Sequence, residues 1–234
     1  MKMQNNTNRF ESQSEKVYRG LREDILNGAL EPGLRLVRRT VGKQYGTSAI
    51  AVAEALWKLE TDGLVENAPM YGARVSTFTL EQVRSEQLLR QALETEIARL
   101  CAMRCQELPI EQLTKQAVAL DKIMSQKRDG HPDDSLPGEI ALHQEFHMAL
   151  ATHCGSDAIA ETLGRIWYRR LMFFNWVNSA MFPVPADWHQ RLLSAIMTGD
   201  PEFADRCMRN HIEHGWEHQM DVLRKLEADA RVKR

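Results

Sequence analysis

The chain has 234 residues, of which 43% are hydrophobic and 26% are charged, and its formal net charge is −2. This length allows one or two globular domains with a sizeable core. No run approaches the roughly 18 apolar residues of a membrane span, and the polar first residues lack the apolar stretch of a signal peptide, so we expect a cytoplasmic protein with no membrane partner.

The first part of the chain predicts a helix-turn-helix. Apolar residues recur at helical spacing over residues 14–27. A second, short helix is expected over 37–45, ended by Gly46, and Thr47 or Ser48 can cap a third helix that continues to Asp62-Gly63. Two helices joined by a turn that contains glycine are typical of a helix-turn-helix.

Two short β-type runs follow the third helix. Residues 64–66 and 73–76 flank a connection that contains Pro and Gly, which predicts a small hairpin, or wing. Thr79 and Gln82 then form a capping-box pattern ahead of a long helical stripe. We therefore place a domain boundary directly after the hairpin.

The rest of the chain is expected to be helical. After the helix that starts near residue 80, the pattern predicts helices at about 110–127, 139–153, 157–180, 186–198 and 201–227. The expected fold class is mainly α, with an N-terminal winged helix-turn-helix followed by an antiparallel all-helical bundle. The expected division is a disordered N-terminus at 1–13, a winged domain at 14–78 and a helical domain at 79–228.

Four cations gather around the helix-turn-helix. Arg35, Arg38, Arg39 and Lys43 fall within a stretch that contains no carboxylate. Taken alone, such a cluster favours ordinary solvated charges on a helix, but beside a helix-turn-helix and a wing it favours contact with DNA phosphates.

The same region resembles the DNA-binding domain of GntR-family transcription regulators. The similarity lies in the runs 21–36, 46–48, 54–56, 59–65 and 72–75. The resemblance implies a winged helix-turn-helix that binds operator DNA as a dimer, with the third helix in the major groove. In that helix the family usually has an arginine at each of two positions, which here are Ala49 and Ala53. It usually has a proline between them, where this chain has Ala51.

The candidate DNA contacts are therefore other residues. We expect Arg38, Arg39 and Lys43 to contact phosphates. Thr47 and Ser48 are further candidate DNA contacts, at the start of the third helix, which is the recognition helix. Arg74, on the wing, is a candidate for the minor groove. Without the two arginines, sequence specificity is expected to be relaxed or redirected.

All eight histidines lie in the second part of the chain, from His131 to His218. His143 and His147 are four residues apart on one expected helix, so they share a face and can chelate one ion. His189 and His211 lie on two later helices, which a bundle can bring inward. Spacing alone leaves open that these are ordinary packing or surface residues.

Residues from about 79 to 227 resemble the FCD ligand-binding domain of the FadR branch of GntR regulators. The matching positions are Arg90 with Glu94, Phe146-His147, and the series His189, Ala195-Ile196, Gly199-Asp200, Ala204 and His211. In metal-binding members the ligands are an Asp, a His four residues later and two further His. The resemblance implies that His143, in the Asp position, binds a divalent ion together with His147, His189 and His211.

A histidine in place of the aspartate shifts the expected metal from Mg²⁺ or Ca²⁺ toward Zn²⁺, Ni²⁺ or Co²⁺. Glu139, one turn earlier, is an alternative carboxylate ligand, and His214 and His218 are weaker alternatives. Arg90 is the candidate anchor for a carboxylate effector, and the alternative is a salt bridge to Glu94.

The sequence thus predicts a dimeric, metal-containing transcription regulator that a small organic acid shifts on or off operator DNA, and not an enzyme. A metal-dependent hydrolase or lyase is a second hypothesis, with Glu139 or Glu145 as general base. A third is an interaction protein that has lost sequence-specific DNA binding, which the alanines of the recognition helix favour.

Overall fold

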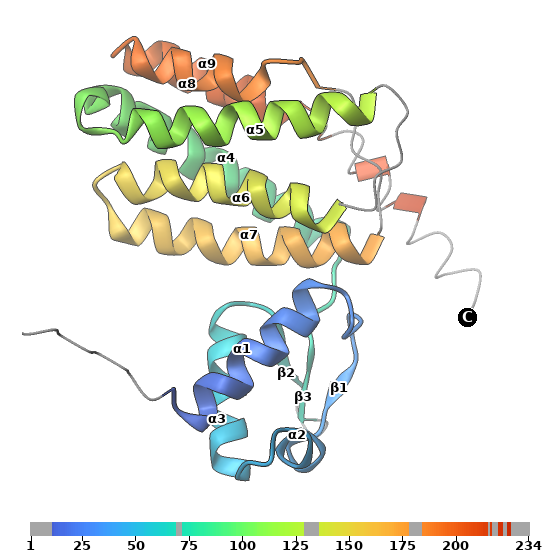
Figure 1. The fold of residues 1–234 in the computed structure, drawn as a ribbon. Coiled ribbons are helices and arrows are strands. Elements are labelled where there is room, and N and C mark those ends of the chain that lie inside the picture. The colour runs from blue at the N-terminus through green and yellow to red at the C-terminus, as the bar shows by residue number, and fades with distance from the viewer. Residues whose placement is uncertain are drawn as a thin grey trace, which may run out of the picture. The chain divides into compact units, whose positions relative to one another are not determined.

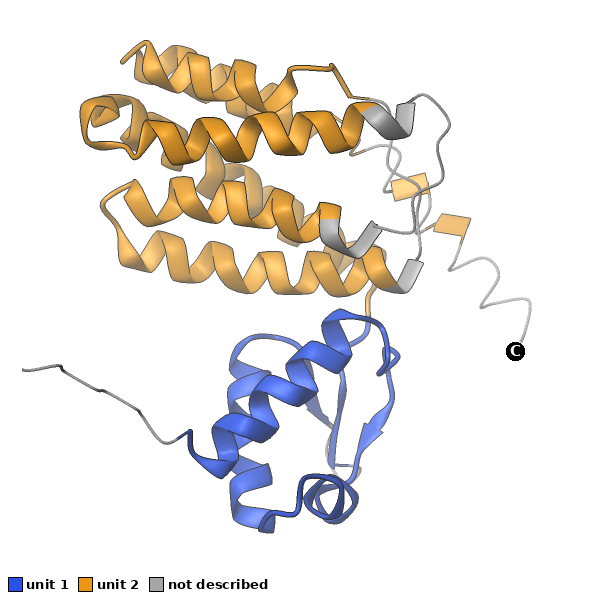
Figure 2. Ribbon diagram, viewed as in Figure 1, with its two compact units in different colours: residues 1–77 blue, residues 78–234 orange. Residues whose placement is uncertain are grey.

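The computed structural model describes residues 11–68, 72–128, 136–177 and 184–214, together with residues 216, 220, 221, 224 and 225. The chain forms two compact units, unit 1 from Met1 to Thr77 and unit 2 from Phe78 to Arg234 (Figure 2). Residues 1–10 of the N-terminus expected to be disordered lie outside the described residues, whereas Gln13 already belongs to the first helix.

Unit 1 contains three helices, α1 (Gln13–Leu26), α2 (Arg38–Tyr45) and α3 (Ala49–Thr61) (Figure 1). The first helix buries an apolar stripe with a four-residue period, Val17, Leu21 and Ile25, and packs on α3. Helix α2 ends at Gly46, which has a left-handed backbone with φ of 62°. The Ser48 hydroxyl accepts a hydrogen bond from the Ala51 amide at 3.2 Å, so Ser48, and not Thr47, caps α3.

A three-stranded antiparallel sheet completes unit 1. Strands β2 (Val65–Ala68) and β3 (Gly72–Val75) form the expected hairpin, whose tip at 69–71 lies outside the described residues. The strand β1 (Arg35–Leu36), which the sequence did not predict, pairs with the other edge of β3 and gives the order β1-β3-β2. Two residues are too short to show an alternating pattern, so only pairing with β3 reveals the strand.

Unit 2 is a helical bundle that begins with the predicted capping box. Thr79 Oγ1 accepts a hydrogen bond from the Gln82 amide, and Gln82 Oε1 accepts one from the Thr79 amide. The bundle helices are α4 (Leu80–Met103), α5 (Ile110–Arg128), α6 (Leu136–His153), α7 (Asp157–Val177), α8 (Trp188–Met197) and α9 (Pro201–Glu213), with a short 3-10 turn, Cys105–Glu107, after α4. Helix α4 packs against α6, α7, α8 and α9, which makes it the central element (Figure 1).

The fold class predicted from the sequence is confirmed, but the last expected helix is not continuous. Helix α9 ends at Glu213, and His214 leaves the helix with φ of −62° and ψ of 123°. Of the described residues beyond it, 216, 220, 221, 224 and 225 are again helical, so the helix expected over 201–227 is interrupted at His214. Within the described residues, no helix is both long and apolar enough to cross a membrane.

Candidate functional site

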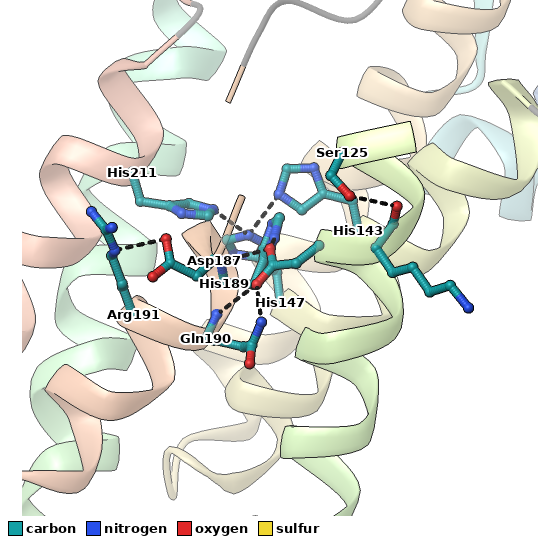
Figure 3. A network of polar contacts seen from close by, with 10 residues as sticks. Ser125, His143, His147, Asp187, His189, Gln190, Arg191 and His211 are labelled. Carbon is teal, nitrogen blue, oxygen red and sulfur yellow. Dashed lines mark hydrogen bonds and ion pairs between the residues drawn. The ribbon is translucent and has the colours of Figure 1, made fainter. Parts of the chain in front are cut away.

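The core of unit 2 contains four histidines. His143 and His147 come from α6, His189 from α8 and His211 from α9, and all four are buried. One ring nitrogen of each lies within 4.8 Å of those of the other three. Figure 3 shows the four rings converging on one place. The structure thus brings together the four residues that the sequence singled out, and no carboxylate belongs to this group among the described residues.

The nitrogen atoms of this four-histidine cluster have the spacing of a metal site. His147 Nε2 lies 2.9 Å from His143 Nε2 and 3.2 Å from His211 Nε2. An ion with metal–nitrogen bonds of about 2.0–2.1 Å holds adjacent ligand nitrogens about 2.9–3.4 Å apart, at angles from about 90° to about 109°, and both of these distances fall in that range. In the described part of the chain, the buried His189 Nε2 has no hydrogen-bond partner. A buried polar atom without a partner is costly, so these residues fit a divalent ion.

Two buried carboxylates orient two of the rings from outside the cluster. Glu94 Oε2 on α4 lies 2.7 Å from His147 Nδ1, and Asp121 Oδ1 on α5 lies 2.7 Å from His189 Nδ1. A carboxylate beside Nδ1 keeps the proton on that atom and leaves the Nε2 lone pair free for an ion.

Asp121 also fixes the start of α8. Its carboxylate accepts hydrogen bonds from the backbone amides of His189 and Gln190, at 3.0 and 3.1 Å. No motif in the sequence singles out Asp121, and Glu94 was expected only as a partner of Arg90.

The protonation states also suit metal binding. Burial lowers the pKa of His143 and of His211 well below the ordinary histidine value, and the neighbouring histidines and Arg90 lower both further. Burial also lowers the pKa of His147 and His189, although Glu94 and Asp121 oppose it. Burial disfavours ionisation of Glu94, but Arg90 and His147 outweigh it and bring its pKa to about 2. Neutral imidazoles are the form that binds metal.

Arg90 lies beside this cluster. It is buried, its Nε donates to Glu94 Oε1 at 2.9 Å, and its guanidinium stands 5.0 Å from the centre of the Trp167 ring. The salt bridge that the sequence left as an alternative is therefore present. Because its charge lowers the pKa of three of the histidines, Arg90 also adds positive potential to the site.

The other candidates around the site fall outside the cluster. Glu139 is buried on α6 but does not belong to the ligand group, and Glu145 is exposed on the outer face of the same helix. The exposed His214 places its ring against Trp188, with centroids 5.2 Å apart. His131 and His218 lie outside the described residues.

The helix-turn-helix carries the second group of candidates. Arg38, Arg39 and Lys43 are all exposed on α2, as is Ser48 at the start of α3. Thr47 is half-buried, and its amide donates to the Gly42 carbonyl at 2.9 Å, within the turn.

The wing arginine, Arg74, is not a free cation. Its Nε lies 3.0 Å from Glu66 Oε1 on the neighbouring strand. Arg74 must therefore leave or share this carboxylate to contact DNA.

The outward face of α3 is largely apolar. Ile50 is 73% exposed and Trp57 is 67% exposed, and Ala49 is also exposed. Val52, Ala55, Leu56 and Leu59 form the opposite, buried face. The only charged residue on the outward face over positions 49–57 is Glu54.

Comparisons with known proteins agree with this architecture. The gntR family of bacterial regulatory proteins matches residues 13–75, and the FCD domain matches residues 87–214. The HTH-type transcriptional repressor RspR of Escherichia coli is 26% identical over 204 residues, which cover 86% of each chain. The Uxu operon regulator of Haemophilus influenzae is 27% identical over 215 residues, which cover 83% of this chain and 77% of the relative.

The fold also resembles solved structures. Escherichia coli McbR/YncC aligns with a TM-score of 0.70 at 21% identity, covering 90% of this chain and 98% of that chain. A GntR regulator from Rhodococcus sp. RHA1 aligns with a TM-score of 0.68 and the same identity, covering 90% and 97%. With a GntR domain followed by an FCD domain that spans more than half of its length, the chain belongs to the GntR family of bacterial transcription regulators, in the group with a C-terminal FCD domain.

Proposed function

We propose that this chain is a ligand-responsive, metal-containing regulator that binds operator DNA as a homodimer and is controlled by a small organic acid. The observation that carries the proposal is the buried four-histidine cluster inside an FCD domain that follows a GntR domain. A GntR domain implies operator binding and an FCD domain implies a small-molecule effector.

The cluster selects the class of metal. A divalent ion would be held by His143, His147, His189 and His211. Four nitrogen donors without a carboxylate favour Zn²⁺, Ni²⁺ or Co²⁺ over Mg²⁺ or Ca²⁺. When bound, the ion supplies Lewis-acid positions for an anionic ligand.

The surrounding residues favour an acid as that ligand. Glu94 and Asp121 hold the imidazoles in place, so the site is preorganised. Arg90 contributes a positive charge whose fork suits a carboxylate, although it must share that fork with Glu94. Burial excludes water and strengthens each of these electrostatic interactions.

Control of DNA binding follows from linkage between the two sites. If the acid binds better to one arrangement of the bundle, it shifts the population toward that arrangement, and the chain segment 76–80 connects the bundle to the winged domain. Acid and operator then change each other's affinity by the same factor. In a dimer the two recognition helices must match half-sites about one DNA turn apart, so a small shift changes affinity strongly. Exposed Leu88 and Leu89 on α4 provide apolar surface for the dimer.

DNA binding by unit 1 rests mainly on phosphate contacts. Arg38, Arg39 and Lys43 supply the charges, and Thr47 and Ser48 approach the backbone at the start of α3. Arg74 contributes only if it gives up Glu66.

The main alternative is an interaction protein without specific DNA binding, because the exposed face of α3 has no arginine. An enzyme is less well supported. The curated relatives are regulators, and Glu145, one of the two candidate general bases, points away from the histidines on an exposed face.

Fluorescence anisotropy tests the proposal. Metal-loaded protein is titrated into the duplex upstream of its own gene and into a scrambled duplex, at two salt concentrations, with and without gluconate, lactate or malate. We expect strongly salt-dependent binding that one of the acids changes. Arg39→Ala should flatten the salt slope by about one unit, whereas Lys115→Ala, an exposed cation on α5, should not. Absence of binding to either duplex at low salt would favour the interaction protein.

A further inference from the structure

Over positions 49–57, the recognition helix α3 lacks the side chains that read guanine. Guanine presents two acceptors, O6 and N7, in the major groove, and it is recognised by bidentate donors such as Arg or Lys. Positions 49–57, in the order Ala-Ile-Ala-Val-Ala-Glu-Ala-Leu-Trp, contain no Arg, Lys, Asn or Gln. Glu54, the one polar residue among them, is exposed and can only accept, so it cannot pair with the guanine edge either.

The first two turns of α3 instead present hydrocarbon to the surface. Ile50 is 73% exposed, and Ala49 is exposed beside it. Ala53, one turn further on, is half-buried, so its methyl group lies at the edge of the same face. Because these positions follow the capping Ser48, they occupy the N-terminal end of the recognition helix, which contacts base edges in helix-turn-helix proteins.

The positive charges on α2 indicate which partner binds beside this apolar face. Arg38, Arg39 and Lys43 are exposed on α2, the helix that leads into the turn, and they complement a phosphate backbone. Because they belong to a GntR domain, DNA is the anionic partner that these three cations favour. In the major groove, the apolar feature of a base edge is the 5-methyl group of thymine, which small side chains contact.

We propose that this regulator reads thymine methyl groups with Ala49, Ile50 and Ala53, and that its operator half-sites are therefore specified by A·T pairs where relatives with arginines read guanines. The inference rests on the proposed DNA binding and states which bases the same site selects. Ile50 is the principal contact because it is the largest exposed side chain of the three. Glu54 adds an acceptor for the amino group of cytosine or adenine next to the thymines.

Thymine and uracil separate this proposal from general DNA binding. Deoxyuridine keeps every hydrogen-bonding group of thymidine and lacks only the methyl group. The full-length protein, as purified, is used to select from two randomised duplex pools, one amplified with dTTP and one with dUTP. The most enriched duplex from the dTTP pool is then synthesised with each thymine replaced in turn by deoxyuridine, and the affinities are compared by anisotropy.

We expect an A·T-containing motif in the dTTP pool and a loss of about fourfold in affinity for each contacted methyl group, which is the factor for burying one such group. Ile50→Ser should remove the difference between thymine and deoxyuridine at the contacted positions. Trp57→Ser, an equally exposed change two turns further along the same helix, should leave that difference intact. Arg39→Ala should lower the affinity for the thymine duplex and for the deoxyuridine duplexes by the same factor. Because the substituted side chains are exposed, each variant should fold, and its thermal melting curve checks this.

Three results would overturn the proposal. A selected motif led by guanines, or equal affinity for the thymine and deoxyuridine duplexes, would exclude methyl reading while leaving DNA binding in place. If the protein retains no duplex from either pool at low salt, the proposed DNA binding itself is excluded. As an independent check, Ala49→Arg should move the selected motif toward guanine.

Discussion

At the scale of single residues, the chemistry of unit 2 depends on how each imidazole is held. His147 and His189 each have a carboxylate at Nδ1, whereas Trp188 stacks on His211 with ring centroids 3.9 Å apart. The three neighbours fix ring planes, and the two carboxylates also fix the tautomers.

The amount of metal in the purified protein should depend on the histidines of the cluster. Purified protein should carry close to one divalent ion per chain, measured by inductively coupled plasma mass spectrometry. His147→Ala and His189→Ala should abolish it, because each removes a nitrogen from the cluster. His214→Ala is the control and should retain the ion. Substoichiometric metal in the wild-type protein after metal-replete purification would contradict the site.

Asp121 is expected to support metal binding without touching the ion. Asp121→Asn keeps the size of the side chain but removes the charge that holds the His189 proton on Nδ1, so metal affinity should fall about 10- to 100-fold. The matched control is Asp187→Asn, because Asp187 pairs with Arg191 at the surface of α8 (Figure 3). Competition with a chelator dye gives both affinities. Equal affinities of the two variants would show that Asp121 only supports the fold.

The metal-free protein should lose stability as the pH falls below about 6.5, the ordinary histidine pKa. In the unfolded chain His143 and His211 bind protons below that pH, whereas burial keeps their folded-state pKa well below it. The free energy of unfolding should therefore fall by up to about 1.4 kcal/mol per pH unit for each histidine. Urea unfolding of chelated protein between pH 7.5 and 5.5 measures this slope. His143→Gln should have a shallower slope, and parallel slopes would show that His143 is protonated when folded.

At the scale of elements, the turn between α2 and α3 places the recognition helix. Its geometry depends on Gly46, whose positive φ favours glycine, and on the hydrogen bond from the Thr47 amide to the Gly42 carbonyl. A Cβ added at Gly46 would meet no atom within 4 Å, so a substitution there changes backbone strain alone.

Gly46→Ala should accordingly make the turn open more readily. A left-handed backbone costs a residue with a Cβ about 1–2 kcal/mol, which corresponds to about 5- to 30-fold faster amide exchange. Hydrogen–deuterium exchange of peptides from residues 38–61 measures the effect, with peptides from unit 2 as the internal reference. Gln44→Ala, at an exposed position of α2, should change nothing. Unchanged exchange in Gly46→Ala would show that the turn does not require glycine.

At the scale of the whole molecule, metal, acid and operator are expected to act on one equilibrium. The histidines come from three helices, and the orienting carboxylates from two more, so the cluster connects α4, α5, α6, α8 and α9. A ligand bound there is linked to the packing of nearly the whole bundle.

An acid that binds at the cluster should stabilise only the metal-loaded protein, because the ion contributes part of its binding energy. Differential scanning fluorimetry with sugar acids and hydroxy acids measures the melting temperature of loaded and chelated protein. Arg90→Lys should reduce the shift, since it keeps a charge near Glu94 but loses the fork. Lys115→Ala serves as the control. Equal stabilisation of the loaded and chelated forms would separate the acid from the metal.

Much of the fold could be predicted because its signals are local. The capping box at Thr79, the stop at Gly46 and the cap at Ser48 each depend on residues a few positions apart. Strand β1 had no such signal, because its pairing with β3 joins Arg35 to Arg74. The interruption at His214 was missed because helical apolar spacing was extended across it from α9 to the helical residues that follow.

The sequence by itself determined the family, the order of the helices and the shared face of His143 and His147, since a helix places residues four apart on one side. Only the tertiary structure decided that His147 meets His211, 64 positions away, and that Asp121 meets His189, 68 positions away. It also decided that Arg74 and Arg90 are paired with carboxylates. Such contacts depend on which helix and strand faces pack together, and this is set by the burial of the whole core rather than by any short stretch of sequence.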